Sequence, residues 1–334
     1  MTKIPGQSES RWPHRLAVML ACATFPLIWV GGLVTTYDAG MAVPDWPNTY
    51  GYNLFLYPWT TWVLGPWDIF IEHGHRLLGA LVGLLTIALN VAVWRYDSRR
   101  WLRYAAAGAL LLVIAQGMLG GLRVLENSRD VARIHACLGP LFFGVTVALA
   151  VVTSRLWHST EPRWESPAAA SLQRWAMLTT ALVYLQLILG AHLRHVSSDW
   201  SAVAVRGVLT FHLLIAALIA VHVGLLAFRT RRMNRSLRLP ALSLVSLLVC
   251  QLILGAGTWI VKYNWPNWFA DVSGPASYTV VSDSWWQASV VTAHVAMGSL
   301  ILAFCVQLTA RSLRLLRPAT LAVCSVTLLK GAAA

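Results

Sequence analysis

The chain has 334 residues, of which 57% are hydrophobic and only 12% carry a charged side chain. This composition excludes a soluble globular domain and indicates a membrane protein. The formal net charge is +13, but the basic residues follow the sides of a membrane rather than forming one patch, so nucleic acid is not an expected partner.

Apolar stretches long enough to cross a bilayer recur along the whole chain. A transmembrane helix needs about 20 residues, and helices are required because lipid satisfies no backbone polar group. The sequence therefore predicts an all-α membrane protein with eight transmembrane helices. The predicted spans are residues 16–36, 73–94, 104–124, 131–154, 172–193, 206–228, 241–262 and 286–310.

The basic residues assign an orientation to these spans. The N-terminus and the segments that follow even-numbered spans hold 19 Lys and Arg, whereas the opposite loops hold 6. The positive-inside rule then places both termini in the cytoplasm. The apolar run from Leu16 is long and lacks a clear cleavage site, which favours a first span over a signal peptide. We expect a bacterial plasma membrane.

The odd-numbered spans share a notch of small residues near their outer ends. The first span ends in Gly31-Gly32, and the later ones repeat a Gln-x-x-Leu-Gly pattern that ends at Gly120, Gly190 and Gly255. Small residues let helices approach closely, so helix packing is the favoured interpretation of the notches. Direct contact with a ligand is the alternative.

Each even-numbered span carries a histidine near its start, followed four positions later by a small residue. Both lie on one helix face, which leaves room for a flat ligand beside the histidine. A single histidine on a helix is usually a satisfied polar residue, but polar side chains repeated in register inside lipid favour a function. The pattern suggests two bis-histidine haem sites. The pairs are His75 with Gly79, His135 with Gly139, His212 with Ala216 and His294 with Gly298.

Four spans lie in each half of the chain. An even number of spans gives residues 1–160 and 161–334 the same orientation, so the halves are predicted to form a parallel repeat of two four-helix bundles. Bundles commonly hold haem between ligands on facing helices. The two histidines of each half would then face each other.

One residue breaks the match between the four even-numbered spans. Glu72 precedes His75 by three positions and shares its helix face. Two interpretations stay open: a charge near a helix N-terminus, favoured by the dipole, or a group that takes part in chemistry. Its presence beside only one of the four histidines favours chemistry in the first half and cofactor holding in the second. The equivalent residues are Ala132, Leu209 and Val291.

Other polar residues of the spans are less informative. His73 points off the face of Glu72 and His75, and His222 is expected to face another helix rather than share the face of His212. His192 and His195, at the end of a span, are either contacts for haem carboxylates or ordinary interfacial residues. The same two interpretations apply to three arginines near the outer surface, which are Arg123, Arg194 and Arg206.

Three stretches together resemble the haem A synthase family. They are Gly31-Gly32-Leu33-Val34-Thr35, Ala42-Val43-Pro44-Asp45-Trp46-Pro47 and Glu72-His73-Gly74-His75-Arg76, and the duplicated eight-span layout extends the resemblance over nearly the whole chain. The family oxidises the C8 methyl group of haem O to the formyl group of haem A, for assembly into terminal cytochrome oxidases. Many members carry a cysteine pair in the first outer loop, whereas residues 37–71 contain no cysteine.

The resemblance implies a role for each candidate residue. His75 and His135 would be the axial ligands of the substrate haem O, His212 and His294 those of a haem b cofactor, and Glu72 the catalytic carboxylate. Haem carries the redox chemistry, while Glu72 could accept a proton or stabilise positive charge at the oxidised carbon. A haem b ligated on both faces has no open position for oxygen and suits electron transfer.

Partners and rival functions follow from the same pattern. The resemblance implies haem O synthase and cytochrome oxidase assembly factors as partners, beside the lipid bilayer, and leaves a homo-oligomer open. A dihaem b-type electron-transfer cytochrome would explain the four histidines but not the solitary Glu72. A haem transporter or chaperone would explain a pocket open toward one leaflet but has less need of two tightly ligated sites.

Overall fold

The computed structural model describes residues 10–159, 163–196, 200–263 and 284–319. Within these ranges eight helices are long and apolar enough to cross a membrane, which confirms the predicted all-α, multi-pass fold. Each begins slightly before the predicted span, because the helices continue through interfacial residues beyond the apolar run. They are α1 (Trp12–Thr36), α3 (Trp67–Tyr96), α4 (Arg100–Leu125), α5 (Arg129–Val152), α7 (Ala169–Arg194), α8 (Ala202–Thr230), α9 (Arg235–Tyr263) and α11 (Trp285–Leu315).

The helices that carry the candidate histidines have well-defined starts. Ser128, Ser201 and Ser284 stand just before α5, α8 and α11, and each hydroxyl accepts a hydrogen bond from a backbone N–H of the first turn, at 3.2 to 3.3 Å. Such N-caps satisfy a donor that the helix cannot. The start of α3 instead follows Pro66. These starts fix the histidines near the outer ends of their helices.

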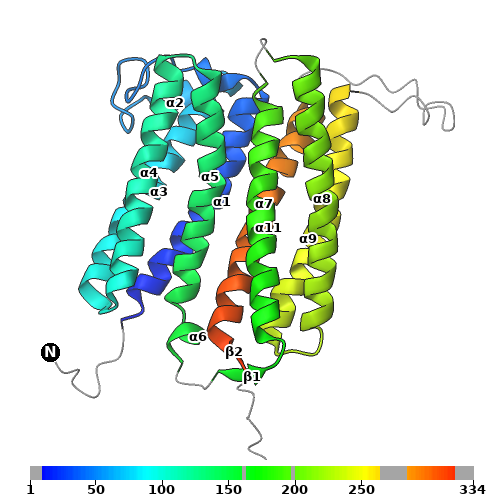
Figure 1. Ribbon diagram of the computed structural model, residues 1–334. Coiled ribbons are helices and arrows are strands. Elements are labelled where there is room, and N and C mark those ends of the chain that lie inside the picture. Colours follow the sequence, from blue (N-terminus) through cyan, green and yellow to red (C-terminus); the bar gives the residue numbers. More distant parts are fainter. Residues whose placement is uncertain (1–9, 160–162, 197–199, 264–283, 320–334) are drawn as a thin grey trace, which may run out of the picture.

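The eight helices stand side by side with the beginning of α1 and the end of α11 at the same end of the molecule (Figure 1). One buried apolar cluster is drawn from α1, α3, α4 and α5, and another from α7, α8, α9 and α11. Helix α11 also contacts α1 and α5, and α5 contacts α7. The two clusters therefore meet along α1, α5, α7 and α11.

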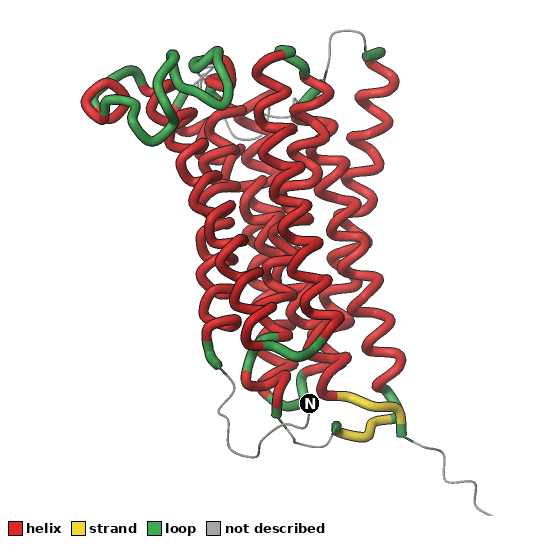
Figure 2. The backbone as a smooth tube through the Cα atoms, turned by 90° about the vertical axis from the view of Figure 1, so that its left-hand side faces the viewer, coloured by secondary structure: helices red, strands yellow, loops and turns green. Residues whose placement is uncertain are grey.

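The connections at the two ends differ in size. Residues 37–66 form a long connection that contains η1 (Ala39–Met41) and α2 (Trp59–Val63) and is gathered over one end of the bundle (Figure 2). At the opposite end, α6 (Arg155–His158) leads to β1 (Trp164–Ser166), which pairs in parallel with β2 (Leu316–Pro318). The long connection lies at the end that carries the candidate site.

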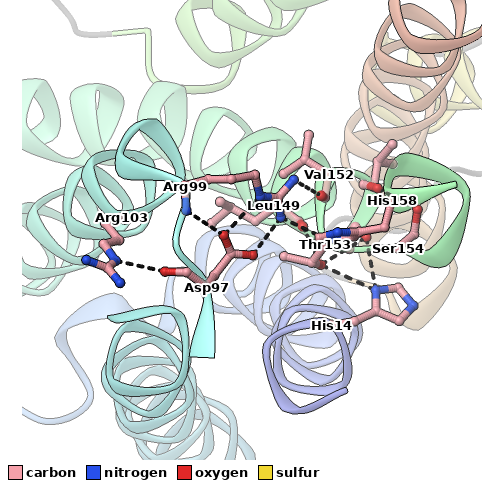
Figure 3. Close-up of polar contacts among 11 residues, drawn as sticks. His14, Asp97, Arg99, Arg103, Leu149, Val152, Thr153, Ser154 and His158 are labelled. Carbon is pink, nitrogen blue, oxygen red and sulfur yellow. Dashed lines mark hydrogen bonds and ion pairs between the residues drawn. The ribbon is translucent and has the colours of Figure 1, made fainter. Parts of the chain in front are cut away.

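A polar network at the strand-bearing end fixes how α1, α4 and α5 sit together (Figure 3). Arg99 donates to both carboxylate oxygens of Asp97 at 2.7 and 2.9 Å and to the carbonyl of Val152 at 2.9 Å. Nδ1 of His14 lies 3.1 Å from the carbonyl of Ala150. Burial raises the pKa of Asp97, but the hydrogen bonds and charge of Arg99 outweigh it and hold the pKa below its usual value.

Candidate functional site

Each of the four candidate histidines packs against a glycine of the preceding transmembrane helix. The contact is with the Cε1 edge of the ring, and at Gly31 and Gly255 it is closer than an ordinary van der Waals contact. The notches therefore serve helix packing, as the sequence predicts. From a Cβ built at the glycine to Cε1 the distances are 2.8 Å for Gly31 and His75, 3.4 Å for Gly120 and His135, 3.5 Å for Gly190 and His212, and 3.1 Å for Gly255 and His294.

The four imidazoles also share an unusual hydrogen-bonding state. In each of them Nδ1 is buried and makes no hydrogen bond to the described residues, while the residue as a whole is only partly buried. A backbone carbonyl one turn before the glycine lies near each ring without meeting hydrogen-bond geometry. These carbonyls belong to Leu27, Gln116, Gln186 and Gln251. One edge of every ring is thus fixed against a helix, and the remainder is free to meet a ligand.

The second pair of histidines has the spacing that a haem iron requires. The ring centroids of His212 and His294 lie 6.5 Å apart, with the ring planes at 60°. Two imidazoles on opposite faces of one iron would have centroids about 6 Å apart, since metal–nitrogen bonds are about 2 Å. Among the described residues no three His, Cys, Asp or Glu side chains converge on a common point. The donor set therefore fits a haem, which needs two protein ligands.

The first pair repeats the packing against glycine. His135 exerts an electrostatic effect on His75, and Arg123 acts on both. Gly79 and Gly139, the small residues beside these histidines, face open space, with nothing within 4 Å of an added Cβ. The predicted flat surface therefore exists in this half.

The same prediction is wrong at Gly298, beside His294. A Cβ there would lie 3.0 Å from Cδ2 of Leu187 and 3.3 Å from Nε2 of Gln251. Side chains from α7 and α9 already occupy this surface, because α11 lies at the centre of its helix cluster. The small residue at this position serves close helix packing.

The Glu72 side chain is buried, and both of its carboxylate oxygens have partners. Its side chain forms an ion pair with Arg76 at 2.8 Å through Oε1, and Oε2 accepts a hydrogen bond from the backbone N–H of Val43 at 2.9 Å. Arg76 in turn donates to the carbonyls of Val43, Asp45 and Asn48 at 2.7 to 2.8 Å. The carboxylate is therefore both a neighbour of His75 on the same helix and an anchor for the outer connection.

The outer connection also docks onto α4, which sequence reasoning missed. The indole of Trp46 lies against Gly121, and the guanidinium of Arg123 lies against Gly40. On α1, Gly32 similarly receives the side chain of Thr292. The sequence feature that could have indicated these contacts is a second glycine in the notch. It occurs at 31–32 and 120–121 but not after Gly190 or Gly255.

A turn in this connection is organised by Asp45. Its two carboxylate oxygens accept backbone hydrogen bonds from Tyr50 and Gly51, both at 2.8 Å, and both of those residues have positive φ. Burial raises the pKa of Asp45, but the two N–H donors and the charge of Arg76 outweigh it and leave the pKa below its usual value. The turn is therefore stabilised by the ionised carboxylate.

The other polar histidines have the packing roles expected of them. Nδ1 of His73 lies 3.1 Å from the hydroxyl of Thr49. Nδ1 of His222 lies 3.2 Å from the hydroxyl of Thr179 on α7. The predictions that neither shares a ligand face are confirmed.

The terminal polar residues near the outer end fall into two groups. Arg123, Arg194 and His195 line one cavity between the ends of α1, α4, α5 and α7. Arg206 is exposed, and His192 contacts the carbonyl of Ile188 at 2.8 Å. The cavity therefore brings together three of the five residues for which the sequence left two interpretations.

The fold and these side chains define a multi-pass membrane protein that carries two pairs of partly buried histidines near one end. A family described as cytochrome oxidase assembly protein matches residues 67–202. A protein named heme A synthase from Exiguobacterium sibiricum is 27% identical over 270 residues, which cover 74% of this chain and 86% of that protein. The heme A synthase of Symbiobacterium thermophilum is 30% identical over 189 residues, 55% of this chain and 58% of that protein.

A third relative, named heme A synthase from Hyphomonas neptunium, is 24% identical over 216 residues, 54% of this chain and 58% of that protein. The matched region thus spans less than two thirds of two of these three relatives. Over these stretches the chain is similar to haem A synthases.

Proposed function

We propose that the protein oxidises the C8 methyl group of haem O to a formyl group and so makes haem A for terminal cytochrome oxidases. The observation that carries this proposal is a buried carboxylate, Glu72, beside one histidine pair only. A protein that only relays electrons between two haems has no need of this asymmetry. The names of the relatives support the same activity.

His212 and His294 are assigned as the axial ligands of a haem b cofactor. The 6.5 Å spacing of their ring centroids supports this assignment. Because Nδ1 is buried in both rings, Nε2 is the nitrogen left to bind iron. A bound haem b would supply one-electron transfer, and His212 and His294 would hold it. The chain holds the two rings in place through Gly190 and Gly255.

His75 and His135 are assigned as the ligands of the substrate haem O. Their Nδ1 atoms are buried in the same way as those of the second pair, against Gly31 and Gly120. The open surfaces at Gly79 and Gly139 leave room beside the imidazoles for a porphyrin. The first half thus binds the molecule that reacts.

Glu72 holds a negative charge one helical turn before His75, on the same face. Conversion of the methyl group to an alcohol adds one oxygen atom from a small-molecule donor, and oxidation of the alcohol to the aldehyde removes protons and electrons, the electrons passing to an external acceptor. The Glu72 carboxylate is placed to accept a proton or to stabilise positive charge at the oxidised carbon. Arg76 and the N–H of Val43 hold the carboxylate in position, so its orientation depends on the outer connection.

We also propose that residues 1–160 and 161–334 are the two functional halves, as parallel four-helix bundles in a bacterial plasma membrane with cytoplasmic termini. The orientation is tested with single exposed cysteines. An impermeant thiol reagent applied to whole cells should label Asn53→Cys, on the outer connection, and not Asn234→Cys, at the opposite end. The reverse pattern would overturn the orientation.

The activity is tested in a bacterial host that makes haem O and lacks its own haem A synthase. Expression of this protein should produce haem A in the extracted haems, identified by mass and absorption. The matched control is His75→Ala, which should leave haem O unconverted. Haem O alone with the wild-type protein present in the membrane would contradict the proposal.

A further inference from the structure

A cavity of about 570 Å³ opens at the outer end of the molecule. Its walls come from both halves of the chain, since Thr35 and Arg123 belong to α1 and α4 and Arg194 to α7. Two arginines of α5 close it against the end of α7: Arg129 donates to the carbonyl of Val196 at 3.4 Å, and Arg133 donates to that of His195 at 3.2 Å. The cavity is therefore built across the junction of the halves.

Among the residues that line the cavity, Arg194 has hydrogen-bonding capacity that a ligand could satisfy. Its Nη2 donates to the carbonyl of Gly32 and to the hydroxyl of Thr36, both at 2.5 Å. Its Nη1 is buried and makes no hydrogen bond to any residue in the described part of the chain. No carboxylate among those residues forms an ion pair with Arg194 either. A buried guanidinium without an anion is destabilising, so an anionic ligand is the expected partner.

The charges around the cavity set the charge of that ligand. Of the described residues that line it, three are arginines, Arg123, Arg129 and Arg194, and one is a carboxylate, Asp38. Burial, together with the nearby arginines, lowers the pKa of His195 to about 4, so this histidine is neutral at pH 7. Three positive charges and one negative charge leave the wall at +2. Two carboxylates would balance it.

The cavity lies directly outside the first histidine pair. Thr35 is four residues beyond Gly31, against which His75 packs, and Ala132 is three residues before His135; both line the cavity. Residues three or four apart share a helix face and are about 5 Å apart along the axis. A porphyrin held between His75 and His135 would therefore present its outer edge to the cavity.

We propose that this cavity binds the two carboxylates of the substrate porphyrin, and that Arg194 of the second half completes the substrate site of the first. The proposal rests on the proposed function for the identity of the porphyrin. Arg194 acts as the carboxylate clamp that also ties α7 to α1 through Gly32 and Thr36. Substrate binding and the junction of the halves thus share one side chain.

The test measures binding without turnover, on the full-length protein in lipid nanodiscs. The second histidine pair is first filled with one equivalent of protohaem, and a second equivalent is then titrated as protohaem or as its dimethyl ester. The wild-type protein should bind the diacid about tenfold to a hundredfold more tightly than the ester, as expected for charged hydrogen bonds. Arg194→Gln should lose most of this preference by weakening the diacid alone.

Arg174→Gln is the matched control, because Arg174 is exposed on the same helix and lies outside the cavity. It should keep the wild-type preference. Retention of the first equivalent of haem and an unchanged unfolding temperature show that each variant is folded. If Arg194→Gln proves unstable, Arg123→Gln replaces it, with the same expected loss of preference.

Equal binding of diacid and ester by the wild-type protein would overturn the proposal, as would full preference retained in both Arg194→Gln and Arg123→Gln. Repeating the titration in nanodiscs that contain anionic lipid tests whether a lipid phosphate headgroup occupies the cavity instead. A haem affinity that anionic lipid lowers without any ester preference would assign the cavity to lipid and overturn the proposal. Because no oxidation is measured, ester discrimination in a protein that makes no haem A would reject only the proposed function.

Discussion

The two halves of the molecule hold their histidines in the same way but differ in what surrounds them. In both halves an imidazole packs on a glycine of the preceding helix, with Nδ1 buried. Among the described residues, a buried carboxylate lies one turn before a histidine in the first half alone, and there it also binds the outer connection through the N–H of Val43. The packing of a histidine on a glycine is thus repeated in both halves, whereas the buried carboxylate to which we assign the chemistry occurs beside His75 alone among the four histidines.

Individual histidines also differ in how tightly they are held, and the tightest and the loosest contacts lie in different halves. An added Cβ at Gly31 would lie 2.8 Å from the ring of His75, closer than real Cβ contacts, whereas at Gly190 it would lie 3.5 Å from the ring of His212, an ordinary contact. The residue beside each glycine differs as well, because Gly32 receives Thr292 while Ala191 follows Gly190. Of His75 and His212, His75 is therefore the more tightly constrained.

The largest expected effect is the loss of the haem b site in the second half. His294→Ala should remove the low-spin, six-coordinate spectrum of the tightly held haem, because the iron loses an axial ligand, while the first half still binds added haem. The measurement is the absorption spectrum of purified protein. His222→Ala, on the packing histidine of α8, is the control and should keep the spectrum. An unchanged spectrum in both His212→Ala and His294→Ala would reject the assignment of the halves.

Next in size is the loss of chemistry in the first half. Glu72→Gln should lower the yield of haem A about a hundredfold or more, as removal of a proton-accepting group does, and leave haem O or its alcohol in extracts. Binding of haem by the His75 and His135 pair should remain, because a neutral amide is less costly to bury than a charge. Haem A at the wild-type level would reduce Glu72 to an anchor of the outer connection.

A matched variant separates chemistry from anchoring. Arg76→Gln breaks the bonds to the carbonyls of Val43, Asp45 and Asn48 and the ion pair with Glu72, but keeps the carboxylate itself and its bond from the N–H of Val43. It should weaken haem O binding more than it slows conversion of bound haem. If Arg76→Gln and Glu72→Gln stall at the same product with the same yield, then the carboxylate acts through the connection alone.

A smaller effect should appear when the two glycine contacts are compared. Gly31→Ala should weaken haem binding at the first pair about tenfold, because the methyl group displaces the His75 ring. Gly190→Ala should keep haem binding at the second pair and stabilise the helix by up to about 1 kcal/mol, since alanine favours helix over glycine. Haem titrations and thermal unfolding measure both. Equal behaviour of the two variants would remove this difference between the halves.

The smallest effect concerns the pH dependence of the outer connection. The folded state lowers the pKa of Asp45 below that of the unfolded chain, which is about 3.9. The ionised carboxylate therefore stabilises the turn above that pH, and the stabilisation is lost as the pH falls through the folded-state pKa. Protease cleavage of the connection should rise below about pH 4 in the wild-type protein. Asp45→Asn should raise cleavage at pH 7 to the acid level; equal cleavage at pH 7 would contradict the role of Asp45.

Much of this arrangement can be predicted from the sequence because it follows helical periodicity. The eight spans, the small-residue notches and the packing roles of His73 and His222 depend on hydropathy and on spacing within one helix. The cross-half contact of Arg194 with Thr36 and the docking of Trp46 on Gly121 could not be predicted. Both join residues far apart in the chain, and neither hydropathy nor periodicity reports which loop meets which helix. The predicted free surface at Gly298 was wrong because the neighbours of Gly298 come from two other helices.

The central claim is that the two histidine pairs hold two different haems, one as cofactor and one as substrate. The most direct measurement is to extract and separate the haems from the purified protein after expression in a host that makes haem O. The account predicts haem b together with haem O or haem A, in equal total amounts, with haem b lost selectively in His294→Ala. Haem b alone, filling both sites, would contradict it and favour a dihaem electron-transfer cytochrome.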